Sequence, residues 1–207
     1  GMQESGEILP NTLVSDIPTR FPGFAPKNFD QNFSGAVPAG YALSQSLNIP
    51  AVGMLQKYTP ERFLELLHKT GFTTFNKKAD YYGLSLILGG GETSLWELTG
   101  VYASLSRVLG RYNNEMKYIK EDYHQPLLLT KDIQPELSSV EGNPPLSAGS
   151  IWLTYEALRK VNRPETETGW QYFASDPELA WKTGTSFGFR DAWAVGTTPD
   201  YVIGVWA

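Results

Sequence analysis

The chain contains no cysteine among its 207 residues, and histidine occurs only at His68 and His124. The absence of cysteine excludes disulfides, thiol nucleophiles and zinc–thiolate sites. The two histidines are far apart and do not have the spacing of metal ligands, so neither a histidine metal site nor a Ser-His-Asp triad is supported. We therefore expect a protein that uses no metal and no cofactor.

Long apolar runs and basic clusters are also absent. No stretch of eighteen apolar residues occurs, and the amino terminus lacks the basic-then-apolar pattern of a signal peptide, so neither a membrane span nor a leader is predicted. The seventeen Lys and Arg residues are scattered, and the net charge is −5. This pattern argues against binding to nucleic acid and favours a neutral or small ligand.

The first two thirds of the chain have mainly helical composition. Residues 8–37 are rich in turn-forming residues and are expected to be extended, and helical character begins at Pro38. Thr59 is expected to cap one helix, and Ser94 and Glu97 to form a capping box for another. The expected helices cover residues 39–47, 51–58, 60–70, 95–109 and 147–161, and residues 111–145 are expected to be irregular with one short strand.

The last part of the chain has the pattern of an antiparallel meander. After a loop over residues 162–178, three apolar segments at 179–186, 192–197 and 201–207 are joined by links of hairpin length. The predicted fold class is α+β, with a mainly helical part over residues 38–161 and a β meander over residues 179–207. Three strands make a thin sheet, so we expect further strands in sequence outside this chain.

Lys182-Thr183-Gly184-Thr185, on the first of these strands, is one candidate binding motif. Alternation places Lys182 and Gly184 on one face and the two threonines on the other. A glycine within a strand permits another backbone to approach closely. An extended peptide could pair along this strand, with the cation and hydroxyls available to a carboxylate. The alternative from the tetrapeptide alone is an ordinary strand with a bulge at Gly184 and a solvated lysine.

Ser46-Leu47-Asn48 forms a second candidate. Residues two apart on a continuous helix point away from each other, but at a helix break both can face one cleft. Pro50 predicts such a break, because it disfavours a helical conformation at Ile49 and suits the first turn of a new helix. Ser-x-Asn alone is common, so simple helix capping remains the alternative.

The pair of motifs resembles the signature of penicillin-binding proteins and serine β-lactamases, whose third part is Ser-x-x-Lys. The resemblance to class A penicillin-binding transpeptidase domains runs over nearly the whole chain and is weakest at residues 111–145. By this resemblance, residues 1–207 are identified as a partial transpeptidase domain, with a truncated form of the fold that penicillin-binding proteins share with serine β-lactamases. The longer matching blocks are Ala42-Leu-Ser-Gln-Ser-Leu-Asn-Ile-Pro-Ala-Val52, Ser85-Leu-Ile-Leu-Gly-Gly-Gly-Glu-Thr-Ser-Leu-Trp-Glu-Leu98 and Trp181-Lys-Thr-Gly-Thr-Ser186.

The resemblance assigns roles to the residues of the two motifs. It implies that Ser46 relays protons near the nucleophile, Asn48 holds the amide side of the substrate and Lys182 supplies positive charge. Thr183, Gly184 and Thr185 would then bind substrate, with the Thr185 N–H as one of two oxyanion donors. The implied partners are peptidoglycan stem peptides and β-lactams. The implied location is the outer face of the inner membrane, with an anchor outside this chain.

The chain departs from the family pattern at the nucleophile. None of its serines has a lysine three positions later, so no Ser-x-x-Lys is present. The opening residues 7–20 resemble the segment that follows this motif. We therefore expect the chain to be part of a longer protein that also carries a glycosyltransferase, and we expect the chain to be inactive alone. The alternatives are a D,D-carboxypeptidase or β-lactamase of the same superfamily, or a non-catalytic binding or scaffolding module.

Overall fold

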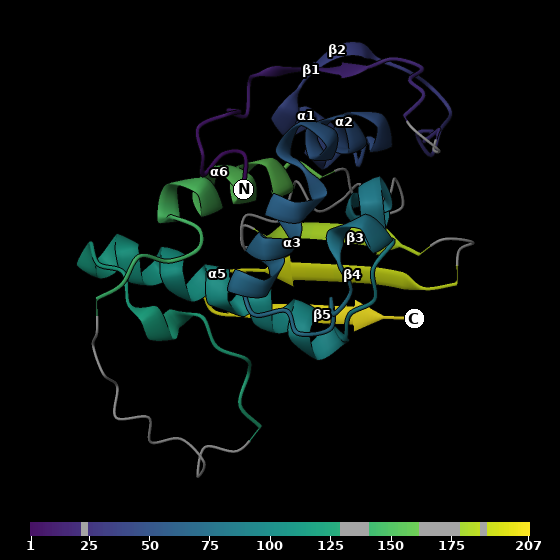
Figure 1. The fold of residues 1–207 in the computed structure, drawn as a ribbon. Coiled ribbons are helices and arrows are strands. Elements are labelled where there is room, and N and C mark those ends of the chain that lie inside the picture. Colours follow the sequence, from purple (N-terminus) through teal and green to yellow (C-terminus); the bar gives the residue numbers. More distant parts are fainter. Residues whose placement is uncertain (22–24, 129–140, 162–178, 187–189) are drawn as a thin grey trace, which may run out of the picture.

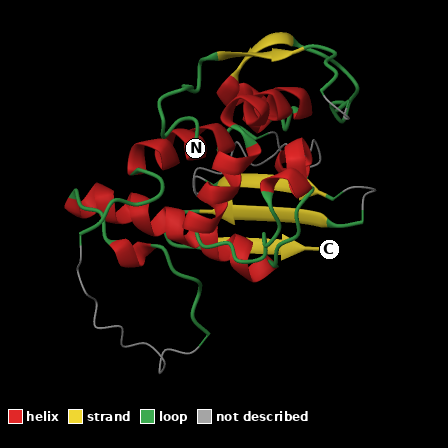
Figure 2. Ribbon diagram, in the orientation of Figure 1, coloured by secondary structure: helices red, strands yellow, loops and turns green. Residues whose placement is uncertain are grey.

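The computed structural model describes residues 1–21, 25–128, 141–161, 179–186 and 190–207 (Figure 1). Helices separate a two-stranded ribbon near the start of the chain from a three-stranded sheet at its end (Figure 2). In chain order, the elements are β1 (Leu13–Asp16), β2 (Gly35–Pro38), α1 (Ala39–Ser44), α2 (Asn48–Tyr58), α3 (Pro60–Lys69), α4 (Ala79–Tyr82), η1 (Gly83–Leu88), α5 (Leu95–Glu115), η2 (Lys120–Asp122), α6 (Ala148–Leu158), β3 (Ala180–Thr185), β4 (Ala192–Thr197) and β5 (Val202–Trp206).

The three strands of the predicted meander are confirmed to within two residues at each end. β3, β4 and β5 pair in that order, and both pairs are antiparallel. Lys182 lies opposite Val195, and Val195 lies opposite Gly204. Because residues directly opposite in a sheet share a face, these three residues point to the same side.

That side of the sheet is covered by α5 and α6 (Figure 1). Ala180 of β3 packs in one core with Val108 of α5 and with Ile151 and Leu158 of α6. A second core gathers apolar side chains of α2, α3, α5 and the segment around η1, including Leu55, Leu64, Phe75, Leu86 and Val101. The structure therefore has the predicted α+β class, with helices packed on an antiparallel sheet.

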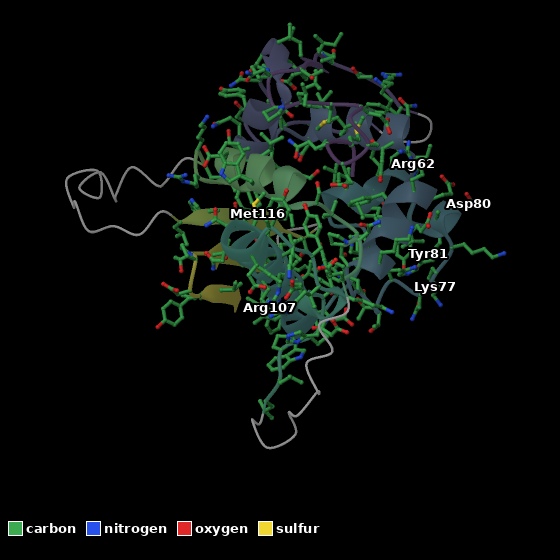
Figure 3. The ribbon with its side chains drawn as sticks, turned by 90° about the vertical axis from the view of Figure 1, so that its left-hand side faces the viewer. Arg62, Lys77, Asp80, Tyr81, Arg107 and Met116 are labelled. Carbon is green, nitrogen blue, oxygen red and sulfur yellow. The ribbon has the colours of Figure 1, made fainter. Side chains whose placement is uncertain are left out.

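The cap predicted for α3 is confirmed. Thr59 precedes Pro60, and its side-chain oxygen accepts a hydrogen bond from Arg62 N at 3.4 Å. Leu64 forms the buried centre of the helix face. Arg62, Asp80 and Tyr81 mark the flank formed by α3 and α4 in Figure 3.

The expected start of α2 at Ala51 is wrong. The helix begins at Asn48, so Ile49 is helical although Pro50 follows it. Proline is tolerated there because the first amides of a helix have no partner within the helix, and Pro50 is only its third residue. The predicted break itself is present, since α1 ends at Ser44 and three residues separate the two helices.

The expected end of the next long helix at Leu109 is also wrong, because α5 continues to Glu115. Arg111 on the added turn bonds Asp122 with Nε at 3.0 and 2.9 Å from the two carboxylate oxygens. Arg107, labelled in Figure 3, donates to Asp122 O at 3.0 Å and to His124 O at 2.7 Å. These bonds hold the following segment against α5 and stabilise the helix beyond Leu109.

Only half of the predicted capping box is formed. Glu97 N donates to Ser94 Oγ at 3.1 Å, as predicted. The Glu97 carboxylate turns instead to the hydroxyls of Thr73, Thr74 and Thr93. Burial raises the pKa of Glu97, but these hydrogen bonds outweigh it and leave that pKa below its usual range.

The early segment is extended as predicted, and it also forms a ribbon that was not foreseen. β1 and β2 pair antiparallel from Leu13 opposite Pro38 to Asp16 opposite Gly35. The ribbon lies beside α1 and α2 (Figure 1). In residues 111–145, the short strand expected there is reduced to a single bridge between Ile119 and Glu141 among the described residues.

The loop expected over residues 162–178 lies outside the described residues, and so does part of the link between β3 and β4. Within the described ranges, no helix has the length and apolar character needed to cross a bilayer. The division into a helical part at 38–161 and a meander at 179–207 stays a prediction.

Candidate functional site

Lys182 lies in the middle of β3, on the face that the helices cover. Two residues away on the same face is buried Ala180, and the residue opposite Lys182 is buried Val195. The alternation of the strand therefore directs the lysine stem along apolar neighbours and brings the ammonium group toward the helices. Burial lowers the pKa of Lys182 below its usual range.

Ser46 lies at the joint between α1 and α2 in a backbone conformation that serines seldom adopt. Its φ is +56°, in the left-handed region. Ser46 N donates to Leu43 O at 3.1 Å, and Leu47 N donates to Ala42 O at 2.9 Å. This is the Schellman arrangement that ends many helices, usually with glycine at the position that Ser46 occupies. The joint thus ends α1 and leaves the Ser46 side chain exposed.

The fold brings Ser46 and Lys182 together although 136 residues separate them. The Lys182 ammonium donates a hydrogen bond to Ser46 Oγ and a second one to Thr183 O at 2.7 Å. No carboxylate in the described ranges forms an ion pair with Lys182. Among the described residues, the site therefore presents a partly desolvated cation whose hydrogen-bond partners are neutral oxygens, a setting suited to an anionic ligand.

Asn48 is the first residue of α2, and the 27–28 segment fixes both its backbone and its side chain. Asn48 N donates to Asn28 Oδ1 at 2.9 Å, and Asn48 Nδ2 donates to Lys27 O at 2.8 Å. The carboxamide is half-buried at the same joint as Ser46. Neither Ser46 nor Lys182 is hydrogen-bonded to Asn48 in the described structure.

Thr183, Gly184 and Thr185 are exposed along β3, which is an edge strand of the described sheet. A Cβ atom built on Gly184 would meet only Trp193 Cβ, at 3.8 Å, among the described atoms. The helix-facing side of the strand at Gly184 therefore has free space next to Lys182. A strand edge, a cation, two hydroxyls and a carboxamide together can bind the backbone and the carboxylate of an extended peptide.

Curated proteins with similar sequences carry one family name. The chain is 33% identical over 203 residues to penicillin-binding protein 1C of Escherichia coli, in an alignment that covers 98% of this chain. The chain belongs to the penicillin-binding protein family. It is also 31% identical over 208 residues to penicillin-binding protein 1A of Aquifex aeolicus. The segment Phe189-Arg-Asp-Ala-Trp-Ala-Val-Gly196 also looks most like the 1C branch, in agreement with this alignment over 98% of the chain.

Solved structures of penicillin-binding proteins have the same fold. PonA1 of Mycobacterium tuberculosis superposes with a TM-score of 0.69 at 18% identity, over 98% of this chain and 56% of that one. The D,D-transpeptidase domain of a peptidoglycan glycosyltransferase from Eggerthella lenta gives 0.68 at 13% identity, over 99% and 57% of the two chains. At these identities, the likeness establishes the fold alone.

The chain spans about a quarter of the length of the curated relatives it matches, 24% for the Escherichia coli protein and 26% for the Aquifex aeolicus protein. A scan against protein-family models found no match. Membership of the penicillin-binding proteins therefore rests on the individual relatives.

Two buried residues next to Asn48 were not predicted from the sequence. Asp16, the last residue of β1, and Asn28 have exposed fractions of 0% and 3%, and Asn28 bonds both Asp16 and the start of α2. The segment was expected to be extended, and no local pattern distinguishes these two residues from its other polar side chains.

The two histidines lie apart from Ser46 and Lys182 and have local partners. His68 Nε2 bonds Phe75 O, and His124 Nδ1 bonds Gln125 O, both at 2.7 Å. No group of three metal-ligating side chains occurs in the part of the chain that the structure describes. The chemistry that the described site offers is carried by hydroxyl, ammonium and amide groups.

Proposed function

We propose that the chain supplies the substrate-binding wall of a serine D,D-transpeptidase that cross-links peptidoglycan stem peptides. In this reaction, a serine hydroxyl attacks the carbonyl carbon of the D-alanyl-D-alanine bond, and the C–N bond breaks to release D-alanine. An amine of a second stem peptide then displaces the serine from the acyl-enzyme. β-Lactams would occupy the same wall and stop the reaction at the acyl stage.

The hydrogen bond between Lys182 and Ser46 is the observation that carries this proposal. It joins the Lys-Thr-Gly and Ser-x-Asn motifs, which are separated by most of the chain, into one site. Either motif alone is common, and their meeting in space is what a shared substrate requires. The penicillin-binding relatives favour the transpeptidase over a β-lactamase or a scaffolding module.

Each residue has a proposed role in this site. Lys182 attracts the terminal carboxylate of the donor peptide and keeps the Ser46 hydroxyl oriented for proton relay. Asn48 bonds the amide groups of the donor. Thr183 and Thr185 add hydroxyl contacts, and the Thr185 N–H is one of two oxyanion donors. A donor of this kind is worth about 100 to 1,000-fold in rate.

The nucleophile lies outside these 207 residues in this proposal, because no serine of the chain is followed by lysine three residues later. The chain alone would bind donor peptides without forming an acyl-enzyme. The longer protein is proposed to carry a glycosyltransferase activity as well and to work at the outer face of the inner membrane, held by an anchor outside this chain.

A binding and labelling experiment tests the proposal. NMR titration with a peptide ending in D-alanyl-D-alanine should shift the amide signals of Lys182 to Thr185, and Lys182→Ala should weaken binding at least tenfold because the carboxylate loses its cation. Lys160→Ala, a change at an exposed lysine after α6, is the matched control. Fluorescent penicillin should label a version extended upstream through Ser-x-x-Lys and leave the 207-residue chain unlabelled.

Two outcomes count against this function. A stable acyl adduct on the 207-residue chain, seen by intact mass, would overturn the claim that it is inactive alone. Failure of the peptide to bind, together with failure of penicillin to label the extended version, would overturn the transpeptidase itself.

A further inference from the structure

The first turn of α2 takes its cap from a distant residue. The first amides of any helix lack partners within the helix, and a side-chain oxygen at the preceding position usually accepts from them. Here that position is Leu47, which has no such oxygen. Asn28 Oδ1 accepts instead from Asn48 N at 2.9 Å and from Ile49 N at 3.4 Å. Asn28 thus caps the helix from twenty residues away.

Asn28 is itself held on its other side. Its Nδ2 donates to Asp16 Oδ1 and to Asn32 O, both at 2.8 Å. A carboxamide has two donor and two acceptor positions, and in Asn28 all four are filled. Asp16 Oδ2 accepts from Ser34 N at 2.8 Å, so the carboxylate is tied to the ribbon in turn. A buried network in which every member is satisfied allows one arrangement only.

The neighbouring residue fixes the side chain of Asn48. Lys27 O accepts the hydrogen bond from Asn48 Nδ2 at 2.8 Å. Asn28 therefore holds the backbone amide of Asn48, and Lys27 holds its carboxamide. Asn48 is the residue of the Ser-x-Asn motif that is proposed to contact an amide of the substrate. Asp16 of the ribbon, which also accepts from Ser34 N just before β2, fixes where Asn28 lies.

We propose that Asn28, held by Asp16, is a positioning residue that orients Asn48 toward the donor peptide. The assignment rests on the proposed function, since Asn48 is the group that touches substrate and Asn28 acts through it. Binding groups must be held to within a fraction of an ångström of the productive geometry, and such placement comes from the buried residues behind them. In this proposal, the segment before α1 contributes to the site through Asp16 and Asn28.

Hydrogen exchange followed by NMR tests the structural half of the proposal. Asn28→Ala removes the acceptor, so the amides of Asn48 and Ile49 should exchange about tenfold faster. The amides of Val52 and Leu55, further along α2, should keep their rates. Asn32→Ala is the matched control, because it changes the same residue type in the same segment and keeps the backbone oxygen that Asn28 uses. Unchanged exchange at Asn48 and Ile49 in Asn28→Ala would overturn the proposal.

A double-mutant cycle tests the functional half with the peptide ending in D-alanyl-D-alanine. Asn28→Ala and Asn48→Ala should each raise the Kd about five- to tenfold, and the double variant should bind no more weakly than Asn48→Ala. A purely structural role would instead weaken binding by the same factor in both backgrounds, which would refute the positioning role. If the wild-type chain does not bind the peptide and the extended version is not labelled by penicillin, the proposed function fails, and the exchange rates still decide whether Asn28 orients Asn48.

Should Asn28→Ala fail to fold, Asp16→Asn provides the same test. This change keeps the size of the side chain and removes the charge from its bond to Asn28. Exchange at Asn48 and Ile49 should then rise about threefold, with the remainder of α2 unaffected. Equal acceleration along all of α2 would show that Asp16 merely stabilises the fold.

Discussion

At the scale of single residues, Ser46 combines an unfavourable backbone conformation with a side chain to which we assign a proposed role in proton relay. A residue with a Cβ atom at φ +56° costs about 1 kcal/mol relative to glycine. Ser46 nevertheless occupies the glycine position of the Schellman turn, where its hydroxyl meets the Lys182 ammonium. Strain of this kind is typical of residues retained for chemistry.

Two replacements of Ser46 separate the effect of its backbone conformation from the effect of its hydroxyl. Ser46→Gly and Ser46→Ala both remove the hydroxyl, but only glycine relieves the backbone. We expect the free energy of unfolding of the glycine variant to exceed that of the alanine variant by about 1 kcal/mol. Urea denaturation measures this difference. Equal stability of the two variants would show that the turn carries no strain at Ser46.

How much of the site could be predicted depends on the range of the contacts that build it. Lys182 and Ser46 belong to short motifs that each allow an ordinary structural reading, and it was the pairing of the two motifs and the family resemblance that made both residues site candidates. Asn28 and Asp16 act through hydrogen bonds to residues 12 to 21 positions away along the chain. Such contacts leave no periodic pattern, so only the folded structure identifies them.

At the scale of elements, hairpin strands were predicted more reliably than helix ends. The strands β3 to β5 are short and are joined by links of hairpin length, both of which are local properties of the sequence. The start of α2 and the end of α5 are set by distant partners, Asn28 in one case and Asp122 in the other. Helix boundaries fixed by such partners cannot be read from local propensity.

The contact between α5 and β5 depends on a glycine. A Cβ atom on Gly204 would lie 2.1 Å from Thr99 Oγ1 and 3.0 Å from Leu95 Cδ1, so α5 approaches the strand backbone directly. Gly204→Ala should therefore lower the free energy of unfolding by about 1–3 kcal/mol, as overpacking does. Chemical denaturation followed by circular dichroism measures the loss.

Two further variants make this prediction specific. Adding Thr99→Ala to Gly204→Ala removes the clashing atoms and should restore part of the loss. Gly110→Ala, on the exposed side of α5 with no atom within 4 Å of the new Cβ, should instead stabilise the chain by about 0.5–1 kcal/mol. A neutral effect of Gly204→Ala would mean that α5 does not pack closely on the strand.

At the scale of the whole molecule, the first residues of the chain are bound to a helix that begins near residue 148. Glu4 Oε2 accepts from Ser147 N and Ser147 Oγ, both at 2.8 Å, and also from Ser150 Oγ. Its carboxylate thereby lies at the amino end of α6, where a negative charge is favourable. The N-terminal segment and α6 are held together by these bonds, which close a loop of more than 140 residues.

This closure makes stability sensitive to acid. Burial raises the pKa of Glu4, but the hydrogen bonds from Ser150 and Ser147 outweigh it and leave that pKa below its usual range. Because the folded-state pKa is depressed, the stabilisation is fully present above about pH 4.3, the ordinary value for glutamate, and is lost as the pH falls through the folded-state pKa. Glu4 is solvent-exposed, so screening limits the stabilisation to about 1 kcal/mol.

Glu4→Gln tests this dependence, since glutamine keeps the shape and removes the charge. We expect the variant to be about 1 kcal/mol less stable than the wild type at pH 7 and equally stable once Glu4 is protonated. Urea denaturation of both proteins between pH 7 and pH 2.5 gives the difference, in which the titration of all other carboxylates cancels. A difference that stays constant over this range, or that grows in acid, would show that the Glu4 charge does not hold the N-terminal segment to α6.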